Sequence, residues 1–89
     1  MKTRKGYILR SLGKEFVLVA EGLDAVDFSR MISLNESAAF LWKSVEDKDF
    51  EAETLVELLL DEYGITRDVA EKDVAALLQT WKETDMIIN

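Results

Sequence analysis

Residues 26–45, VDFSRMISLNESAAFLWKSV, change their hydrophobic period partway along the stretch and so predict a strand followed directly by a helix. Up to Leu34, apolar and polar residues mostly alternate, which is typical of a strand with one buried face. From Asn35 onward, apolar residues recur every three or four positions, which indicates an amphipathic helix. Asn35 is a favourable N-cap, and Glu36 is suitably acidic for the first turn.

The residues before this junction predict two further strands. Apolar runs at 7–10 and 15–20 are bounded by glycines at positions 6, 13 and 22. Together with 26–34 they predict a three-stranded antiparallel meander. In the third strand we expect one core-facing side, with Arg30 as its exception; its apolar members are Val26, Phe28, Ile32 and Leu34.

The residues after the junction predict three helices. The first has an apolar stripe and ends at the polar segment 46–49. The second runs from about 52 to 63, with Gly64 as a left-handed cap, and the third runs from Thr66 as N-cap to about 83. We expect Trp42 and Tyr63 to be core residues with a polar atom near the surface. The apolar segment 86–88 is either a last strand or a tucked tail.

The order of these elements decides the fold class. Three strands followed by three helices lack the crossovers of a parallel α/β sheet. We therefore expect an α+β fold, with a three-stranded antiparallel sheet followed by three helices, related to winged-helix domains. The chain has 89 residues, of which 48% are hydrophobic, so 1–89 is predicted to be a single domain.

Composition excludes many functions. The chain contains neither cysteine nor histidine, which removes disulfides, thiolate or imidazole catalysis and the usual zinc and iron–sulfur ligands. No cofactor or metal site is predicted, and we expect the protein not to be an enzyme. No secretory signal or membrane span is recognisable, so a cytoplasmic location is expected.

Charge is distributed unevenly along the chain. Residues 1–30 carry six basic and four acidic side chains, whereas residues 31–89 carry five basic and fourteen acidic ones, within a formal net charge of −7. This balance argues against nucleic-acid or anionic-membrane partners. The basic cluster at the N-terminus, Lys2, Arg4, Lys5 and Arg10, favours a solvated, partly disordered tail over a contact surface.

The junction and the helical spacings together resemble the PqqD-like family, named after pyrroloquinoline quinone biosynthesis protein D. The most specific piece is Leu34-Asn35-Glu36-x-Ala38-x-x-x-Trp42, and the resemblance extends over 55–63, 73–78 and 86–88. It implies a RiPP precursor peptide recognition element, a non-catalytic peptide chaperone. Such an element binds the leader of a ribosomally made precursor and presents it to a maturation enzyme, often a radical S-adenosylmethionine (SAM) protein.

The resemblance also implies where the leader binds. In that family the leader adds as a strand to the sheet edge, beside the third helix. Here this mapping points to Phe28, Arg30, Met31 and Ile32 on the third strand and to Val74, Leu77, Leu78 and Trp81 on the third helix. Arg30 either pairs with a leader carboxylate or emerges to solvent. The helix residues form a stripe that is more often simply core.

Other functions share some of these sequence features. A winged-helix DNA-binding or transcription-regulating domain shares the architecture, but the third helix has three basic and four acidic residues. The acids Glu53, Glu57, Asp61 and Glu62 favour a solvated helix face over paired catalytic carboxylates. A structural subunit without a peptide ligand stays open. An unprotected strand edge also allows pairing with a second copy of the chain.

Overall fold

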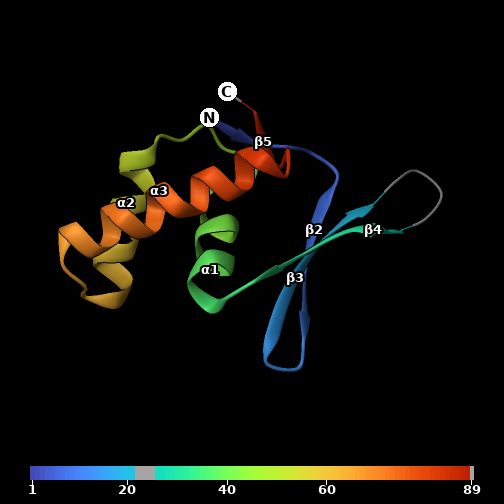
Figure 1. Cartoon of the computed structure of the whole chain (residues 1–89), viewed down its shortest axis with the longest axis horizontal. Coiled ribbons are helices and arrows are strands. Elements are labelled where there is room, and N and C mark those ends of the chain that lie inside the picture. Colours follow the sequence, from blue (N-terminus) through green and yellow to red (C-terminus); the bar gives the residue numbers. More distant parts are fainter. Residues whose placement is uncertain (22–25, 89) are drawn as a thin grey trace.

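The computed structural model describes residues 1–21 and 26–88, and the side chains of 1–19 and 31–88. Strands β2 (Tyr7–Leu12), β3 (Glu15–Glu21) and β4 (Val26–Leu34) form an antiparallel sheet in the order β2-β3-β4. Helices α1 (Glu36–Val45), α2 (Ala52–Tyr63) and α3 (Arg67–Glu83) follow it. The predicted α+β fold is confirmed. Figure 1 shows the helices at one end of an elongated molecule and the strands extending from the other.

Strand β4 does not keep one register with β3 along its length. Leu18 of β3 pairs with Ile32, whereas Ala20, two residues further on, pairs with Asp27, five residues back along β4. Such a shift is typical of a bulge, which inserts unpaired residues into one strand. Of the predicted apolar face, Ile32 is half-buried and Leu34 is buried, whereas the side chains of Val26 and Phe28 lie outside those that the structure describes.

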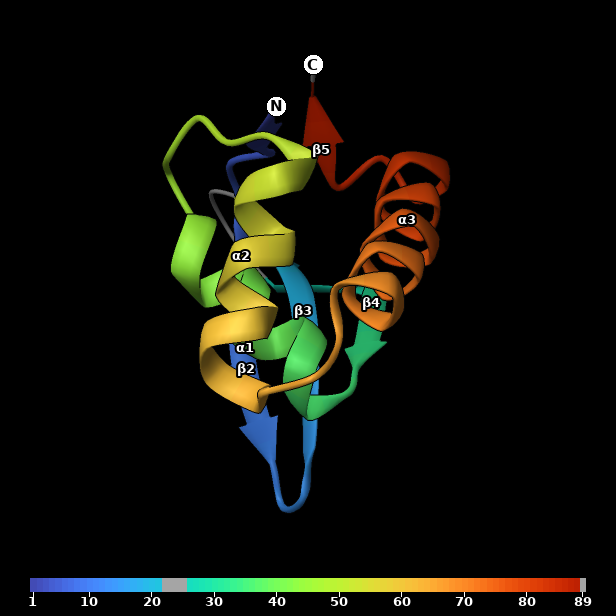
Figure 2. The same cartoon turned by 90° about the vertical axis from the view of Figure 1, so that its left-hand side faces the viewer.

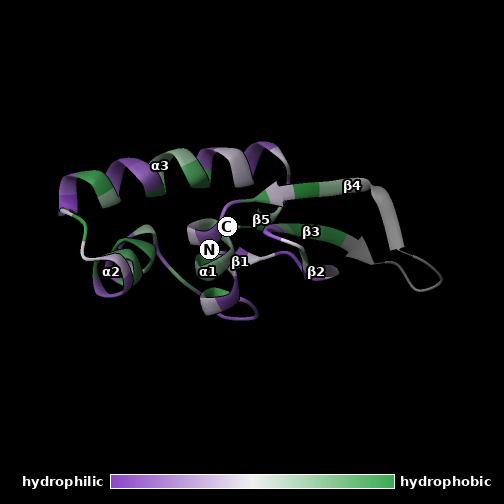
Figure 3. Cartoon of the chain, turned by 90° about the horizontal axis from the view of Figure 1, so that it is seen from below, coloured by the Kyte–Doolittle hydropathy of each residue, from purple (hydrophilic) through white to green (hydrophobic). Residues whose placement is uncertain are grey.

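One hydrophobic core joins the sheet to all three helices. Leu18, Leu55 and Met86 are fully buried within it. Trp42 packs edge-on against Trp81, with ring centroids 5.2 Å apart. In Figure 3 the helices alternate between hydrophilic and hydrophobic residues along their length, as expected for helices with one buried face.

The two aromatic residues predicted to be core residues with a polar atom near the surface differ in their surroundings. The Trp42 indole nitrogen is buried and has no hydrogen-bond partner among the described residues, so the predicted polar atom near the surface is wrong for Trp42. The Trp42 ring packs edge-on against the rings of Trp81 and Tyr7. Tyr63 is exposed at the end of α2 and packs edge-on against Phe40, so the prediction that it is a core residue is wrong.

The helix ends follow the capping residues predicted from the sequence. The Asn35 side-chain oxygen accepts from the Ala38 amide at 2.8 Å, and the Thr66 hydroxyl accepts from the Val69 amide at 3.4 Å. Gly64 ends α2 with a φ of 61°, in the left-handed region. The two N-caps satisfy amide groups that have no partner within the helix, and they confirm the predicted starts of α1 and α3. The Gly64 amide donates to the Leu60 carbonyl and confirms the predicted end of α2.

The two ends of the chain are paired with each other. β1 (Lys2–Thr3) pairs antiparallel with β5 (Ile87–Ile88), and Arg4 forms an ion pair with Asp85 at 2.9 Å. The prediction of a partly disordered basic tail is therefore wrong. The sequence did not indicate this pairing, because it joins residues far apart in the chain and leaves no local pattern. Of the two alternatives for 86–88, the strand is the one observed.

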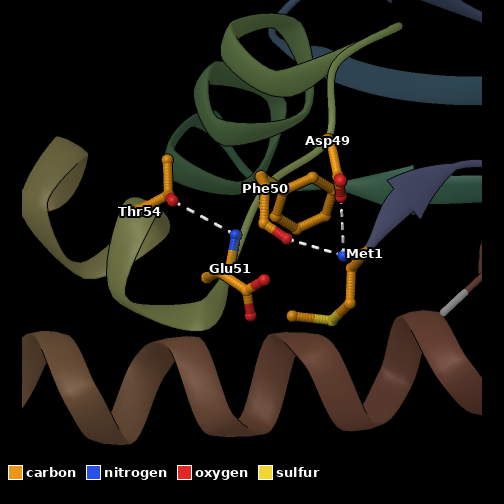
Figure 4. Close-up of polar contacts among 5 residues, drawn as sticks. All are labelled: Met1, Asp49, Phe50, Glu51 and Thr54. Atoms are coloured by element: carbon orange, nitrogen blue, oxygen red, sulfur yellow. Dashed lines mark hydrogen bonds and ion pairs between the residues drawn. The ribbon is translucent and has the colours of Figure 1, made fainter.

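The segment between α1 and α2 joins this arrangement. The Met1 amine donates to the Asp49 carboxylate at 3.1 Å and to the Phe50 carbonyl at 2.7 Å (Figure 4). The hydrogen bond from that amine, followed by its positive charge, lowers the pKa of Asp49. Next along the chain, the Glu51 amide donates to the Thr54 hydroxyl at 3.1 Å at the start of α2.

Candidate functional site

Strand β4 presents an open edge. Within the described strands it pairs with β3 on one side, and β3 is the central strand of the sheet. Successive residues of an antiparallel edge strand direct their N–H and C=O groups alternately toward the paired side and the open side. The open side of β4 is therefore a row of main-chain donors and acceptors suited to an added strand.

A groove begins where β4 ends. It lies between the N-terminal turns of α1 and the middle of α3, and its volume is about 340 Å³. Figure 2 shows β4 passing into α1 with α3 alongside. The apolar lining includes Leu41, Leu59 and Leu77. The polar lining consists of Asn35, Ser37, Asp73 and Thr80.

The structure divides the predicted helix residues into two groups. Leu77 is half-buried and lines the groove. The other three, Val74, Leu78 and Trp81, are buried in the core, where they pack α3 against the rest of the domain. Their contact with a ligand stays a prediction.

The strand residues are placed less evenly. Ile32 is half-buried and packs against the core, whereas Met31 is 47% exposed. The side chains of Phe28 and Arg30 lie outside those that the structure describes. For all four, a role in ligand binding also stays a prediction.

Most of the groove residues were missed by sequence reasoning. On α3 the groove is lined by positions 73, 76, 77 and 80, one step around the helix from the buried positions 70, 74, 78 and 81. This face mixes an acid, an alanine, a leucine and a threonine, so its hydropathy gives no pattern. Its helical spacing was a usable signal, as was the position of Asn35 at the strand-to-helix junction.

Charges on the surface of α3 do not form a basic face. The Arg67 guanidinium donates to Glu53 at 2.8 Å and lies 3.9 Å from Glu57. The hydrogen bond and charge of Glu53 raise the pKa of Arg67. One of the three basic residues of α3 is thus neutralised within the molecule, and nothing here supports the DNA-binding alternative.

A second hollow lies on another face of α1. Its volume is about 420 Å³, and Phe40 and Tyr63 line it together with Glu36 and Glu62. Burial, followed by the charges of Glu36 and Glu62, raises the pKa of Tyr63. Lys43 also lines this hollow, so its charges are mixed.

Among the described residues, no three histidine, cysteine, aspartate or glutamate side chains lie close enough together to hold a metal ion. Likewise, no helix in the described part of the chain is long and apolar enough to cross a membrane. A groove with both apolar and polar lining beside an open strand edge supplies main-chain hydrogen bonds and a side-chain pocket.

Solved structures with the same fold include two complexes. One is described as "TbiB1 in Complex with the TbiA(beta) Leader Peptide"; it has a TM-score of 0.71 and 19% identity, over 97% of this chain and 93% of that one. The other is described as "Lasso peptide synthetase B1 complexed with the leader peptide", with a TM-score of 0.70 and 24% identity, over 99% and 96% of the two chains. At this level of identity the likeness shows a shared fold.

Sequence comparisons identify the family. No curated protein sequence matches this chain. A family model, "Coenzyme PQQ synthesis protein D (PqqD)", matches residues 15–87, which include the β3–β4 pair, the groove and all three helices. The chain therefore belongs to the PqqD family.

Proposed function

We propose that this protein is a non-catalytic adapter that binds the leader of a ribosomally synthesised precursor peptide. The leader adds as a strand to the open edge of β4, and the adapter presents it to a maturation enzyme such as a radical SAM protein. Synthesis of the precursor on ribosomes places this step in the cytoplasm.

The observation that carries the proposal is the open β4 edge leading into the groove between α1 and α3. Strand addition gains main-chain hydrogen bonds with little regard to sequence, and a pocket for alternate side chains adds selectivity. Both parts are present here within one short stretch, because Asn35 directly follows the last residue of β4 and also lines the groove.

Two further findings support the proposal. The chain belongs to the PqqD family, and two proteins with the same fold were solved with leader peptides bound. The absence of cysteine and histidine from the sequence agrees with a role that leaves chemistry to a partner.

The test places proline singly at Ile32 and at Ser33. These neighbours lie where the β3–β4 register is regular, opposite Leu18 and Val17. Their amide groups face opposite edges of β4, and proline removes the amide donor. A displayed library of random peptides is first selected on the immobilised protein, and the strongest binder is synthesised as the probe.

One proline variant should lose a bond to β3 and be measurably less stable. The other should keep its circular dichroism spectrum and melting transition yet lose affinity for the selected peptide in calorimetry. Ile32→Ala and Ser33→Ala serve as controls for loss of the side chain. Unchanged affinity in both folded proline variants would exclude strand addition at β4. A library that yields no binder would contradict the peptide-binding function itself.

A further inference from the structure

We propose that the groove between α1 and α3 is a specificity pocket for a lysine or arginine side chain of the leader. This inference rests on the proposed function, because it concerns the side chain that the bound strand would place beyond the end of β4. It follows from the groove's apolar lining, its unused hydrogen-bonding groups and its charge.

The apolar lining suits the stem of a long side chain. Leu41 and Leu59 are almost fully buried, and half-buried Leu77 lines the same groove from α3. Lysine and arginine place their methylene groups along such surfaces while the charged head reaches a polar rim. The polar residues therefore decide between these side chains and a wholly apolar one.

The hydroxyl groups in the groove present acceptors. The Ser37 hydroxyl donates to the Asn35 side-chain oxygen at 3.1 Å, and the Thr80 hydroxyl donates to the Ala76 carbonyl at 3.2 Å. A hydroxyl has one proton and two lone pairs, so these two retain lone pairs for a ligand. A bound side chain therefore has to supply the protons, as an ammonium or guanidinium group does.

The Asn35 side chain is oriented by its role as a cap. Its oxygen already accepts from the Ala38 amide and from Ser37. Its amide nitrogen is the remaining side-chain donor among the groove residues, and it belongs to the first residue after β4. At that position it is suited to a carbonyl of the added main chain, which leaves the acceptors for the side chain.

Charge points to the same ligand. Asp73 is the one charged residue among the groove residues, and no ion pair of its carboxylate occurs within the described part of the chain. It lies in a region, 31–89, that carries fourteen acidic and five basic residues. An acidic leader side chain would be repelled here, whereas a cation gains a charge-assisted hydrogen bond.

The experiment compares peptide preferences of the native protein and of Asp73→Lys, using the same displayed library of random peptides. The native protein should enrich lysine or arginine at one fixed position of the selected peptides. Asp73→Lys should shift that position toward aspartate or glutamate. Glu71→Lys is the matched control, because it makes the same change in net charge on α3 at an exposed residue that does not line this groove.

Binding of one selected peptide then gives the size of the effect. Asp73→Asn should weaken it about fivefold at low salt, as expected for an exposed ion pair, and added salt should reduce the difference. Glu71→Gln should leave the affinity nearly unchanged. Selected peptides with no basic preference, or equal shifts in Asp73→Lys and Glu71→Lys, would overturn the pocket while leaving strand addition intact. Failure to select any peptide would overturn both proposals.

Discussion

Leu55 shows how much of the domain's stability depends on single core side chains. Its exposed fraction is 0%, and it lies in the cluster shared by the sheet and the helices, whereas Leu12 in β2 is 56% exposed. Leu55→Ala should lower the free energy of unfolding by about 2–5 kcal/mol, because it removes buried surface and leaves a cavity. Leu12→Ala should change it by less than about 0.5 kcal/mol. Urea unfolding measures both, and equal effects would contradict the packing of α2.

Substitution of Gly64 is limited by its backbone conformation rather than by a lack of space for a side chain. Its φ is 61°, and a Cβ added there would meet no atom within 4 Å. Gly64→Ala should therefore cost about 1 kcal/mol through the left-handed conformation alone. Gly64→Asn should cost less, since asparagine tolerates that region better. A melting temperature for Gly64→Ala at or above that of the native protein would show that α2 does not end in this cap.

At the scale of elements, the local sequence signals predicted the helix ends correctly, whereas the sequence did not predict the long-range strand pairing. Asn35, Thr66 and Gly64 act within a few residues of their own position, so the sequence predicted their helix ends. The pairing of 2–3 with 87–88 joins opposite ends of the chain, and two-residue strands are too short to show alternation. The register shift in β4 was missed because it depends on where β3 lies.

In the candidate site, too, the local feature was predictable from the sequence and the long-range one was not. The open strand edge was predictable from the sequence. The last strand of a three-stranded meander pairs on one side only, and this strand contains no proline. The groove was not, because it forms where α1 and α3 meet and its polar residues have no hydropathy pattern. Asp73 and Thr80 acquire their place in the groove only through that packing.

The terminal strand β5 offers a test of long-range pairing. Ile87 is 6% exposed and its neighbour Ile88 is 42% exposed, so the two isoleucines differ mainly in burial. Ile87→Ala should destabilise the protein by about 2–5 kcal/mol in urea unfolding. Ile88→Ala should cost clearly less, since a large part of this side chain is already in contact with water. Equal costs would mean that β5 does not dock as observed.

The whole molecule carries its charges in two unequal parts. Residues 1–30 have two more basic than acidic side chains, and residues 31–89 have nine more acidic than basic ones. All three helices belong to the acidic part, and so does the groove. The helix that would enter a DNA groove in a winged-helix regulator therefore lies in a negative field, which repels phosphates.

Duplex DNA provides the test of that charge distribution. A short fluorescent duplex titrated with the protein at low ionic strength should show no change in anisotropy up to high micromolar protein. Low salt is the most favourable condition for binding, because the release of counterions from DNA favours binding less as the salt concentration rises. Asp73→Lys is a useful comparison, since its added charge lies in the groove and not in a basic face, so it too should fail to bind. Micromolar affinity that weakens steeply with salt would mean that the basic residues of 1–30 form a DNA-binding surface, and it would favour a transcription-regulating role over the peptide adapter.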